Sequence, residues 1–245
     1  MKRNKIFGLI GRNIGYSFSK NYFTKKFELE NISCSYLNFD IESLKILEPI
    51  FSENKIAGLN VTTPYKEEII NYLDEIEQTA LYIGAVNTIK IIKNKKIGYN
   101  TDYLGFEKSL VNIINKEKIQ TALILGSGGA TKAIKYSLEN LGISHNTVSR
   151  TKGKCKYTYK DLSKEIINNH RLIINCSPVG TFPNVDKSPK VPYKFLNQQN
   201  ILYDLVYNPS ESLFLKKGLE RGCKIKNGLE MLEIQAEESW RIWNS

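Results

Sequence analysis

Two periodicities of hydrophobic and polar positions succeed one another along the first part of the chain. Short apolar runs, typical of buried strands, alternate with segments whose apolar residues recur at helical spacing. The runs predict strands at Lys5–Gly11, Ser35–Ile41 and Ile56–Thr62, and a hairpin of Val86–Ile92 with Lys96–Asn100 around Asn94-Lys95. The helical spacing predicts helices at Ser19–Leu29, Ile41–Phe51 (broken near Pro49), Glu75–Ile83 and Asp102 to about Ile114, with Asp102 as N-cap and Pro64 able to open a further helix.

The pattern restarts after the polar stretch Asn115–Gln120, which is typical of a junction between domains. Strands are predicted at Thr121–Leu125, Asn146–Arg150, Leu172–Cys176 and Ile201–Leu205. Helices are predicted at Gly129–Leu141, Lys160–Asn168, Glu211–Gly218 and, as a strongly amphipathic last segment, Leu229–Trp243. Because strands separated by helices imply a parallel sheet with right-handed crossovers, the sequence predicts an α/β protein of two domains.

The charge of the chain favours a solvated basic surface. Its 245 residues carry 35 Lys and Arg against 25 Asp and Glu, a net charge of +10. A nucleic-acid-binding protein would gather its basic residues on one element with aromatic residues between them, whereas here the lysines are spread along the chain. The positive field would instead attract an anionic substrate or a phosphorylated cofactor.

The remaining composition excludes several classes of protein. No apolar run approaches the length of a membrane span, and the short run after the basic N-terminus is not a signal peptide. The four cysteines and two histidines are dispersed, without metal-ligand spacing, so neither a metal site nor a disulfide is expected. Dispersed thiols fit a reducing compartment, and we expect a cytoplasmic protein.

A glycine loop follows the first strand of the second domain. Gly126, Ser127, Gly128, Gly129 and Ala130 lie between that strand and a helix, where glycines allow a tight turn and a close approach of the backbone to a pyrophosphate. Thr131 stands where the full dinucleotide fingerprint has another small residue. The loop predicts a dinucleotide-binding domain of Rossmann type, with a glycine-rich turn that binds nothing as the alternative.

The residues after the next strand favour NADP over NAD. An NAD enzyme places an acidic residue there to bind the ribose 2′-hydroxyl, but no carboxylate follows Arg150 before Asp161. Arg150 can instead stack on adenine or bind a 2′-phosphate, with Thr151 as a donor and Lys154 as a further charge. The alternative is that these side chains simply face the solvent.

Polar clusters follow the strands of the first domain. Ser17 and Ser19 lie between a strand and a helix, where they could hold a carboxylate or where one of them could simply cap the helix. Lys66 and Asp102 belong to two further clusters at predicted strand ends. Beside a nicotinamide, such a pair can pass a proton to or from a hydroxyl carbon's oxygen while hydride moves.

Taken together, these motifs resemble the shikimate dehydrogenase family over nearly the whole chain. The resemblance is carried, in family order, by Ser17/Ser19, Asn60–Lys66, Gly84–Thr88, Asn100–Asp102, Gly126–Ala130, Ser149–Thr151, Asn175–Gly180 and Gly228–Ala236. It implies NADPH-dependent, reversible reduction of 3-dehydroshikimate to shikimate, on the route to aromatic amino acids. It also implies an N-terminal substrate-binding and catalytic domain of residues 1–101 with the returning helix 228–245, and a Rossmann-like NADP-binding domain of residues 102–227.

The resemblance assigns roles position by position. Lys66 and Asp102 would be the catalytic pair, with Lys66 the proton donor to the carbonyl oxygen. Ser17 and Ser19 would hold the substrate carboxylate. The ring hydroxyls would be contacted by Thr62, Asn87, Asp102, Tyr207 and Gln235. The cofactor would be bound by Gly126, Ser127, Gly128, Gly129, Ala130, Ser149, Arg150, Thr151, Lys154, Leu205 and Gly228.

Three positions depart from the family pattern, and none affects the catalytic pair. Ser149 stands where Asn is usual, Lys154 where Arg is common and Leu205 where Met is frequent, so the preference for NADP over NAD could be weakened. The alternatives are a broader quinate/shikimate dehydrogenase, whose usual NAD preference predicts an acidic residue soon after Arg150, and a non-catalytic NADP-binding module, which predicts loss of Lys66 or Asp102. We expect a small-molecule substrate, no nucleic-acid or membrane partner, and a monomer or homodimer.

Overall fold

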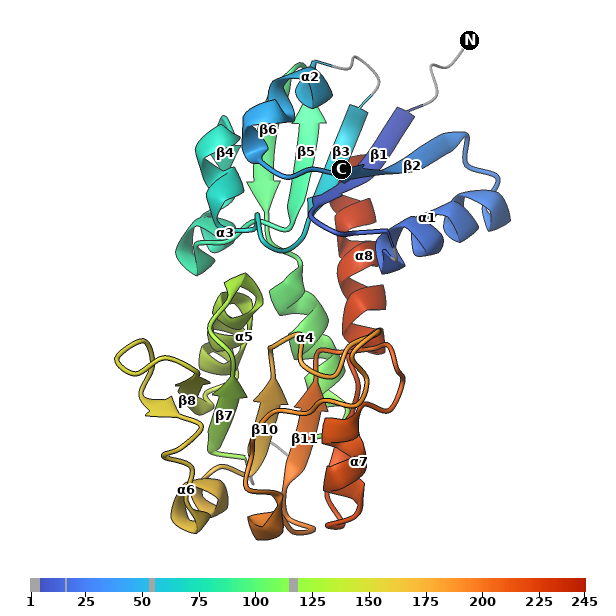
Figure 1. The fold of residues 1–245 in the computed structure, drawn as a ribbon. Helices are drawn as coiled ribbons and strands as arrows, with labels where there is room; N and C mark the ends of the chain where they lie inside the picture. Colours follow the sequence, from blue (N-terminus) through green and yellow to red (C-terminus); the bar gives the residue numbers. More distant parts are fainter. Residues whose placement is uncertain (1–4, 16, 53–55, 115–118) are drawn as a thin grey trace. The chain divides into compact units, whose positions relative to one another are not determined.

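The computed structural model describes residues 5–15, 17–52, 56–114 and 119–245 (Figure 1). The chain divides into two compact units, one of Met1–Asp102 with Gln235–Ser245 and one of Tyr103–Ile234. Most of the predicted junction at residues 115–120 falls on 115–118, outside the described residues. The last helix, α8 (Leu229–Asn244), therefore begins in the second unit and ends in the first.

The first unit is built on a six-stranded mixed sheet with the order β2-β1-β3-β5-β6-β4. The strands are β1 (Lys5–Gly11), β2 (Cys34–Asp40), β3 (Ile56–Val61), β4 (Glu75–Ile76), β5 (Thr88–Ile92) and β6 (Lys95–Tyr99). The helices of this unit, besides the end of α8, are α1 (Phe18–Leu29), α2 (Leu47–Phe51), α3 (Gln78–Ile83) and the 3₁₀ helices η1 (Leu44–Ile46) and η2 (Glu68–Tyr72). β5 runs antiparallel to both β3 and β6, so its first residue lies at the same edge as the last residues of those strands.

Three local predictions for this unit are wrong. The predicted break at Pro49 is absent because α2 starts at Leu47, and Pro49 occupies a first-turn position whose N–H needs no partner within the helix. Pro64 opens a turn and not a helix, and the 3₁₀ helix η2 starts only at Glu68. The hairpin turn lies one residue earlier than predicted, because Lys93 and Asn94 both have a positive φ, as a two-residue hairpin loop requires.

An aromatic core covers one face of this sheet. Phe7 of β1 stacks on Trp243 of α8 with ring centroids 4.7 Å apart, and Phe23 of α1 stacks on Tyr36 of β2 at 4.8 Å. The Trp243 indole lies directly over Gly58, where a Cβ atom would approach its Nε1 to 2.3 Å, and that Nε1 donates to the Ile89 carbonyl at 3.0 Å. The end of α8 is therefore seated on the strands β3 and β5.

The second unit is a six-stranded, wholly parallel sheet with the order β12-β11-β10-β7-β8-β9. Its strands are β7 (Thr121–Leu125), β8 (Ser144–Ser149), β9 (Tyr157–Thr158), β10 (Leu172–Asn175), β11 (Ile201–Asp204) and β12 (Lys224–Lys226). Its helices are α4 (Asp102–Val111), α5 (Gly129–Asn140), α6 (Lys164–Asn169), α7 (Leu213–Leu219) and the 3₁₀ helix η4 (Tyr193–Phe195). The strand order reverses between β7 and β10, which is the position where open α/β sheets bind ligands.

A buried carboxylate ties the loops together at the carboxyl edge of this sheet. Asp204, the last residue of β11, accepts hydrogen bonds from the Asn175 amide at 2.9 Å, the Val206 backbone at 3.0 Å and the Ser212 hydroxyl. Burial raises the pKa of Asp204 from the ordinary 3.8 to about 6, against the lowering effect of these three hydrogen bonds. Cys176 and Tyr193, the titratable groups that face it, are themselves held neutral by burial, which raises the pKa of each.

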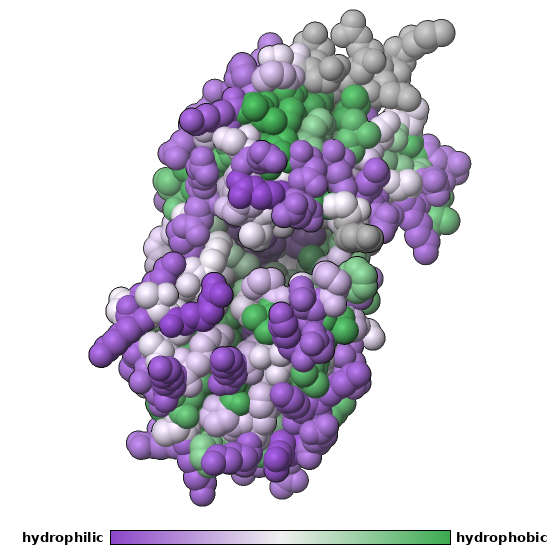
Figure 2. All heavy atoms as spheres, in the orientation of Figure 1, coloured by the Kyte–Doolittle hydropathy of each residue, from purple (hydrophilic) through white to green (hydrophobic). Residues whose placement is uncertain are grey.

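The surface is largely polar. Figure 2 shows hydrophilic residues over most of the visible face of each unit, with apolar residues in smaller groups between them. Within the described ranges, no helix is both long and apolar enough to cross a membrane. Among the same residues, no group of three or more His, Cys, Asp or Glu side chains is arranged to hold a metal ion.

Gly58→Ala is expected to destabilise the first unit by about 1–3 kcal/mol, because the added methyl group collides with the packed Trp243 indole. The midpoint of urea unfolding, followed by tryptophan fluorescence, measures the effect. Gly15→Ala is the matched control, since a Cβ there meets nothing within 4 Å. Equal midpoints for the two variants would contradict the packing described.

Asp204→Asn is expected to stabilise the second unit at pH 7.5 by about 1–3 kcal/mol. The folded state binds the Asp204 proton more tightly than the unfolded state does, so wild-type stability decreases as pH rises from about 4 to above 6. Asn keeps the shape and the acceptor oxygen but carries no charge, so its advantage should disappear at pH 4.5. Urea midpoints at both pH values test this, with the exposed Glu220→Gln as control. An advantage that did not change with pH would refute it.

Candidate functional site

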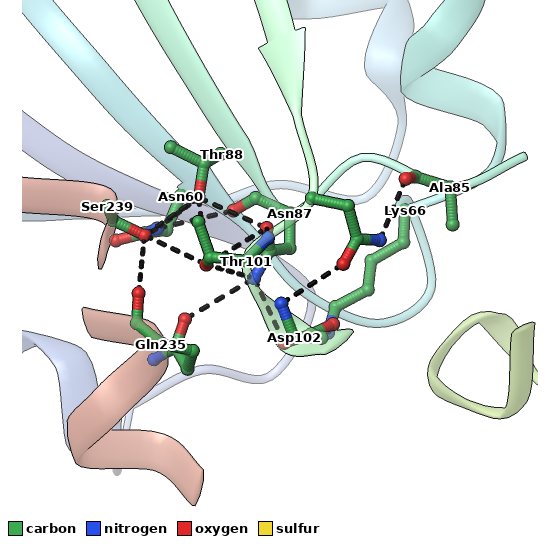
Figure 3. A network of polar contacts seen from close by, with 10 residues as sticks. Asn60, Lys66, Ala85, Asn87, Thr88, Thr101, Asp102, Gln235 and Ser239 are labelled. Carbon is green, nitrogen blue, oxygen red and sulfur yellow. Dashed lines mark hydrogen bonds and ion pairs between the residues drawn. The ribbon is translucent and has the colours of Figure 1, made fainter. Parts of the chain in front are cut away.

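An ion pair lies at the edge of the first sheet where the ends of β3, β5 and β6 meet (Figure 3). The Lys66 Nζ donates to Asp102 Oδ2 at 2.6 Å. The side chains are 15% and 7% exposed, so the pair is screened from bulk water but still reachable from it. A partly desolvated ammonium beside a carboxylate can give up and regain a proton, which is what acid–base catalysis requires.

The Asn87 amide fixes the second oxygen of that carboxylate. Its Oδ1 accepts the Thr101 backbone N–H at 2.7 Å, and because that group can only donate, the amide orientation is settled. The Nδ2 then donates to Asp102 Oδ1 at 2.9 Å, with Gln235 Oε1 at 3.3 Å. Both oxygens of Asp102 are thus engaged, one by a cation and one by an amide.

Hydrogen bonds at the same sheet edge also fix the backbone around the Lys66–Asp102 pair. The Lys66 carbonyl accepts the Val86 N–H at 2.7 Å, which ties the turn after β3 to the segment before β5. Asn100 accepts the Asp102 N–H at 3.0 Å and donates to the Ala85 carbonyl at 2.9 Å. The prediction that Asp102 is the N-cap is wrong, since α4 begins at Asp102 itself and the carboxylate is bonded to Lys66 and Asn87.

The two serines lie at the start of α1. Ser17 is its N-cap and accepts the Lys20 N–H at 3.3 Å, so the capping alternative holds for this residue, and its hydroxyl hydrogen can still serve a ligand. The Ser19 side chain hydrogen-bonds the buried Tyr36 hydroxyl, which donates to Asn60 Oδ1 at 2.7 Å. Thr62 follows β3 and its N–H donates to the Ile10 carbonyl at 2.9 Å, so it lies at the same sheet edge.

Several buried polar residues at this edge were not predicted as part of a site. Asn60, Thr88, Thr101 and Ser239 join the residues above in one hydrogen-bonded network (Figure 3). Tyr36 is joined to it through Asn60. Asn60, Thr88 and Thr101 fall inside the sequence motifs but were assigned no role there. Ser239 follows Gln235 by four residues, and a polar residue at that spacing on an otherwise apolar helix face was the signal available.

The glycine loop of the second unit fits a pyrophosphate. Gly126 has φ +126, a conformation that favours glycine, and a Cβ there would press on the Cys176 backbone at 3.2 Å. Gly128 precedes α5, and the space beside its Cα contains no atom of the described residues within 4 Å of a Cβ. The first turn of α5 has no acidic residue and its N-cap makes no side-chain hydrogen bond, so the helix dipole there favours an anion.

The residues predicted to recognise a 2′-phosphate follow β8. Ser149 ends the strand and its hydroxyl donates to the Thr151 carbonyl at 2.6 Å, which shapes the turn. Arg150, Thr151 and Lys154 are exposed. Asp161, the first acidic residue after the strand, accepts two hydrogen bonds from Thr158 at 2.7 and 2.8 Å, and these lower its pKa.

Leu205 and Gly228, predicted to lie by the nicotinamide, are in contact. A Cβ at Gly228 would approach the Leu205 carbonyl oxygen to 2.3 Å, and the Gly228 N–H donates to the Val206 carbonyl at 3.2 Å. Tyr207 follows in the same loop after β11. The second unit therefore gathers the glycine loop and this loop at the carboxyl edge of its sheet, where Leu205 N–H also donates to the Asn175 carbonyl at 3.0 Å.

Comparison with known proteins identifies the family of this chain. A family model described as the shikimate dehydrogenase substrate binding domain matches residues 9–89. The shikimate dehydrogenase (NADP(+)) of Methanococcus aeolicus is 37% identical, over 98% of this chain and 92% of that protein. The crystal structure of shikimate dehydrogenase from Aquifex aeolicus superposes with a TM-score of 0.89 at 33% identity, over 100% of this chain and 94% of that one. The Thermus thermophilus enzyme, in complex with NADP(H) and shikimate, gives 0.86 at 28% identity, over 98% and 93%. With this identity over nearly the full length of both proteins, the chain belongs to the shikimate dehydrogenase family.

Proposed function

We propose that this protein catalyses the reversible reduction of 3-dehydroshikimate to shikimate with NADPH, as an oxidoreductase of aromatic amino acid biosynthesis. The observation that carries the proposal is the Lys66–Asp102 pair at 2.6 Å, held beside Asn87 and Gln235 at one sheet edge. The names of the relatives, which are NADP-dependent shikimate dehydrogenases, support the same substrate and cofactor.

Substrate binding uses hydroxyl and amide groups that suit a carboxylate-bearing polyol. Ser17 and Ser19 bind the carboxylate with their hydroxyls, aided by the N-terminus of α1, which favours an anion. Thr62, Asn87, Asp102, Tyr207 and Gln235 bind the ring hydroxyls. A site of this kind rejects analogues that lack a hydroxyl, because its buried polar groups would be left without partners.

The chemical step needs a proton at the substrate oxygen. As the carbonyl carbon receives hydride, the oxygen takes a proton from Lys66 Nζ, and the carbonyl becomes a hydroxyl. In the reverse direction Lys66 accepts that proton as hydride leaves the carbon. Asp102 orients the ammonium by its hydrogen bond and stabilises the charged form of Lys66 after each reverse turnover.

The second unit would hold the cofactor, which in its reduced form, NADPH, would supply the hydride from its nicotinamide ring. The backbone of Gly126, Ser127, Gly128, Gly129 and Ala130 binds the pyrophosphate at the start of α5. Ser149, Arg150, Thr151 and Lys154 bind the 2′-phosphate end, and Leu205 and Gly228 border the nicotinamide. We further infer that the enzyme works in the cytoplasm as a monomer or homodimer, without nucleic-acid or membrane partners.

Lys66→Ala is expected to lower kcat for shikimate oxidation by about 10²–10⁴-fold, because the proton-transfer group is lost, while the KM for shikimate changes less. Initial rates with NADP test this. Lys95→Ala is the control, since Lys95 forms an exposed ion pair with Glu75 in the same unit. Full activity of Lys66→Ala would overturn the catalytic assignment.

Arg150→Ala is expected to raise the KM for NADP by about 10-fold or more and to leave the KM for NAD nearly unchanged, since only NADP carries the 2′-phosphate that the guanidinium binds. Rates with both cofactors, measured side by side at low and high salt, test this. Because Arg150 is exposed, the difference should shrink at high salt. A wild-type enzyme that preferred NAD would refute the cofactor assignment.

A further inference from the structure

Ser239 is fully buried, and its hydroxyl belongs to the polar network of the first unit (Figure 3). It donates to the Gln235 carbonyl one turn earlier in α8 at 2.9 Å. Asn60 Nδ2 donates to it at 3.0 Å, and the Thr88 and Thr101 hydroxyls lie at 2.8 and 3.2 Å. This one side chain therefore connects the helix to β3, to β5 and to the segment that leads into Asp102.

The hydrogen-bond capacity of these groups makes Ser239 hard to replace. A serine hydroxyl has one hydrogen and two lone pairs; that of Ser239 accepts from Asn60 Nδ2 and lies within hydrogen-bond distance of the Gln235 carbonyl and of the Thr88 and Thr101 hydroxyls, so all of its bonding capacity is used. Asn60 Nδ2 has two hydrogens, directed at Ser239 and at the Asn87 carbonyl at 3.2 Å. Without Ser239, the remaining acceptor for one of those hydrogens is Thr88 at 3.3 Å. Thr88 in turn bonds the Asn87 Oδ1 at 3.1 Å, so the disturbance reaches the amide that holds Asp102.

The spacing along α8 shows what Ser239 positions. Gln235, Ser239 and Trp243 recur every four residues and so lie on one face of the helix. At the C-terminal end of that face, Trp243 packs on Gly58 and donates to the Ile89 carbonyl. In the middle of the face, Ser239 hydrogen-bonds Asn60 and Thr88. One turn further toward the N-terminus, the Gln235 side chain reaches Asn87.

We propose that Ser239 is a positioning residue for substrate recognition: by joining α8 to the strand ends at Asn60 and Thr88, it sets the placement of the Gln235 and Asn87 side chains. The proposal rests on the proposed function, because those two side chains are the ones assigned to the ring hydroxyls. Ser239 does not touch substrate or cofactor itself. Its contribution lies in substrate affinity and not in proton transfer or cofactor binding.

The test compares Ser239→Ala with Ser109→Ala. Ser109 is also a fully buried helical serine that donates to a carbonyl one turn earlier, at 3.0 Å, and contacts a second hydroxyl, that of Tyr203, at 2.6 Å, but it belongs to the second unit. Each variant loses buried hydrogen bonds, so similar losses of thermal stability are expected. Only Ser239→Ala should raise the KM and the calorimetric Kd for shikimate, by about tenfold, with the KM for NADP within about twofold of wild type.

A second variant covers the case in which Ser239→Ala does not fold. Ser239→Cys keeps the size of the side chain but hydrogen-bonds poorly, so it should shift the KM for shikimate in the same direction. A shikimate KM that stays at the wild-type value in folded Ser239→Ala or Ser239→Cys overturns the proposal, as does an equal rise in Ser109→Ala. A wild-type protein that fails to oxidise shikimate would instead overturn the proposed function, so the two failures are distinguishable.

Discussion

At one edge of the sheet in the first unit, every buried polar group needs a hydrogen-bond partner. This requirement determines how the side chains there are arranged. Asn87 is the centre of that constraint, since its oxygen is fixed by a backbone N–H that can only donate and its nitrogen must therefore face Asp102. The antiparallel direction of β5 makes the arrangement possible, because it brings the start of that strand beside the ends of β3 and β6. A parallel strand in its place would carry Asn87 to the opposite edge, away from Lys66. The catalytic geometry thus follows from strand direction before any single contact is considered.

Asp102 and Asp204, the carboxylates buried among the described residues, show two different solutions to the cost of burying charge. Asp102 has a cation at 2.6 Å on one oxygen and an amide on the other. Asp204 has neutral donors alone among its hydrogen-bond partners in the described structure, and its pKa rises to about 6. The first arrangement gives each oxygen of the carboxylate a partner and holds it against Lys66. The arrangement around Asp204 suits a residue that connects loops, because such a residue needs acceptor atoms with defined directions and keeps its role when it is partly protonated.

Sequence patterns predicted the parts of the structure that depend on local spacing. The glycine loop between β7 and α5 was predicted because strand, turn and helix each leave a signal within a few residues. The two- or three-residue strands β4, β9 and β12 were missed, since their pairing depends on neighbouring strands and not on their own pattern. Lys66 and Asp102 were predicted through the family motifs, whereas Ser239 was not. Its role depends on which strand residues the last helix packs against, and no local pattern contains that information.

The preference for NADP that this chain implies depends more on the lack of a carboxylate that would favour NAD than on the attraction between basic side chains and the 2′-phosphate. Arg150, Thr151 and Lys154 are exposed, so the attraction between their groups and a 2′-phosphate is weakened by water and salt. What would favour NAD is a carboxylate able to accept from the ribose 2′-hydroxyl, and the residues from Arg150 to Lys160 contain none. Asp161, the first candidate, is occupied by Thr158. The same region therefore has no carboxylate that would repel a 2′-phosphate or accept from the ribose 2′-hydroxyl of NAD. For this reason the enzyme can still discriminate between NADP and NAD with Lys154 and Ser149 in place of the usual family residues.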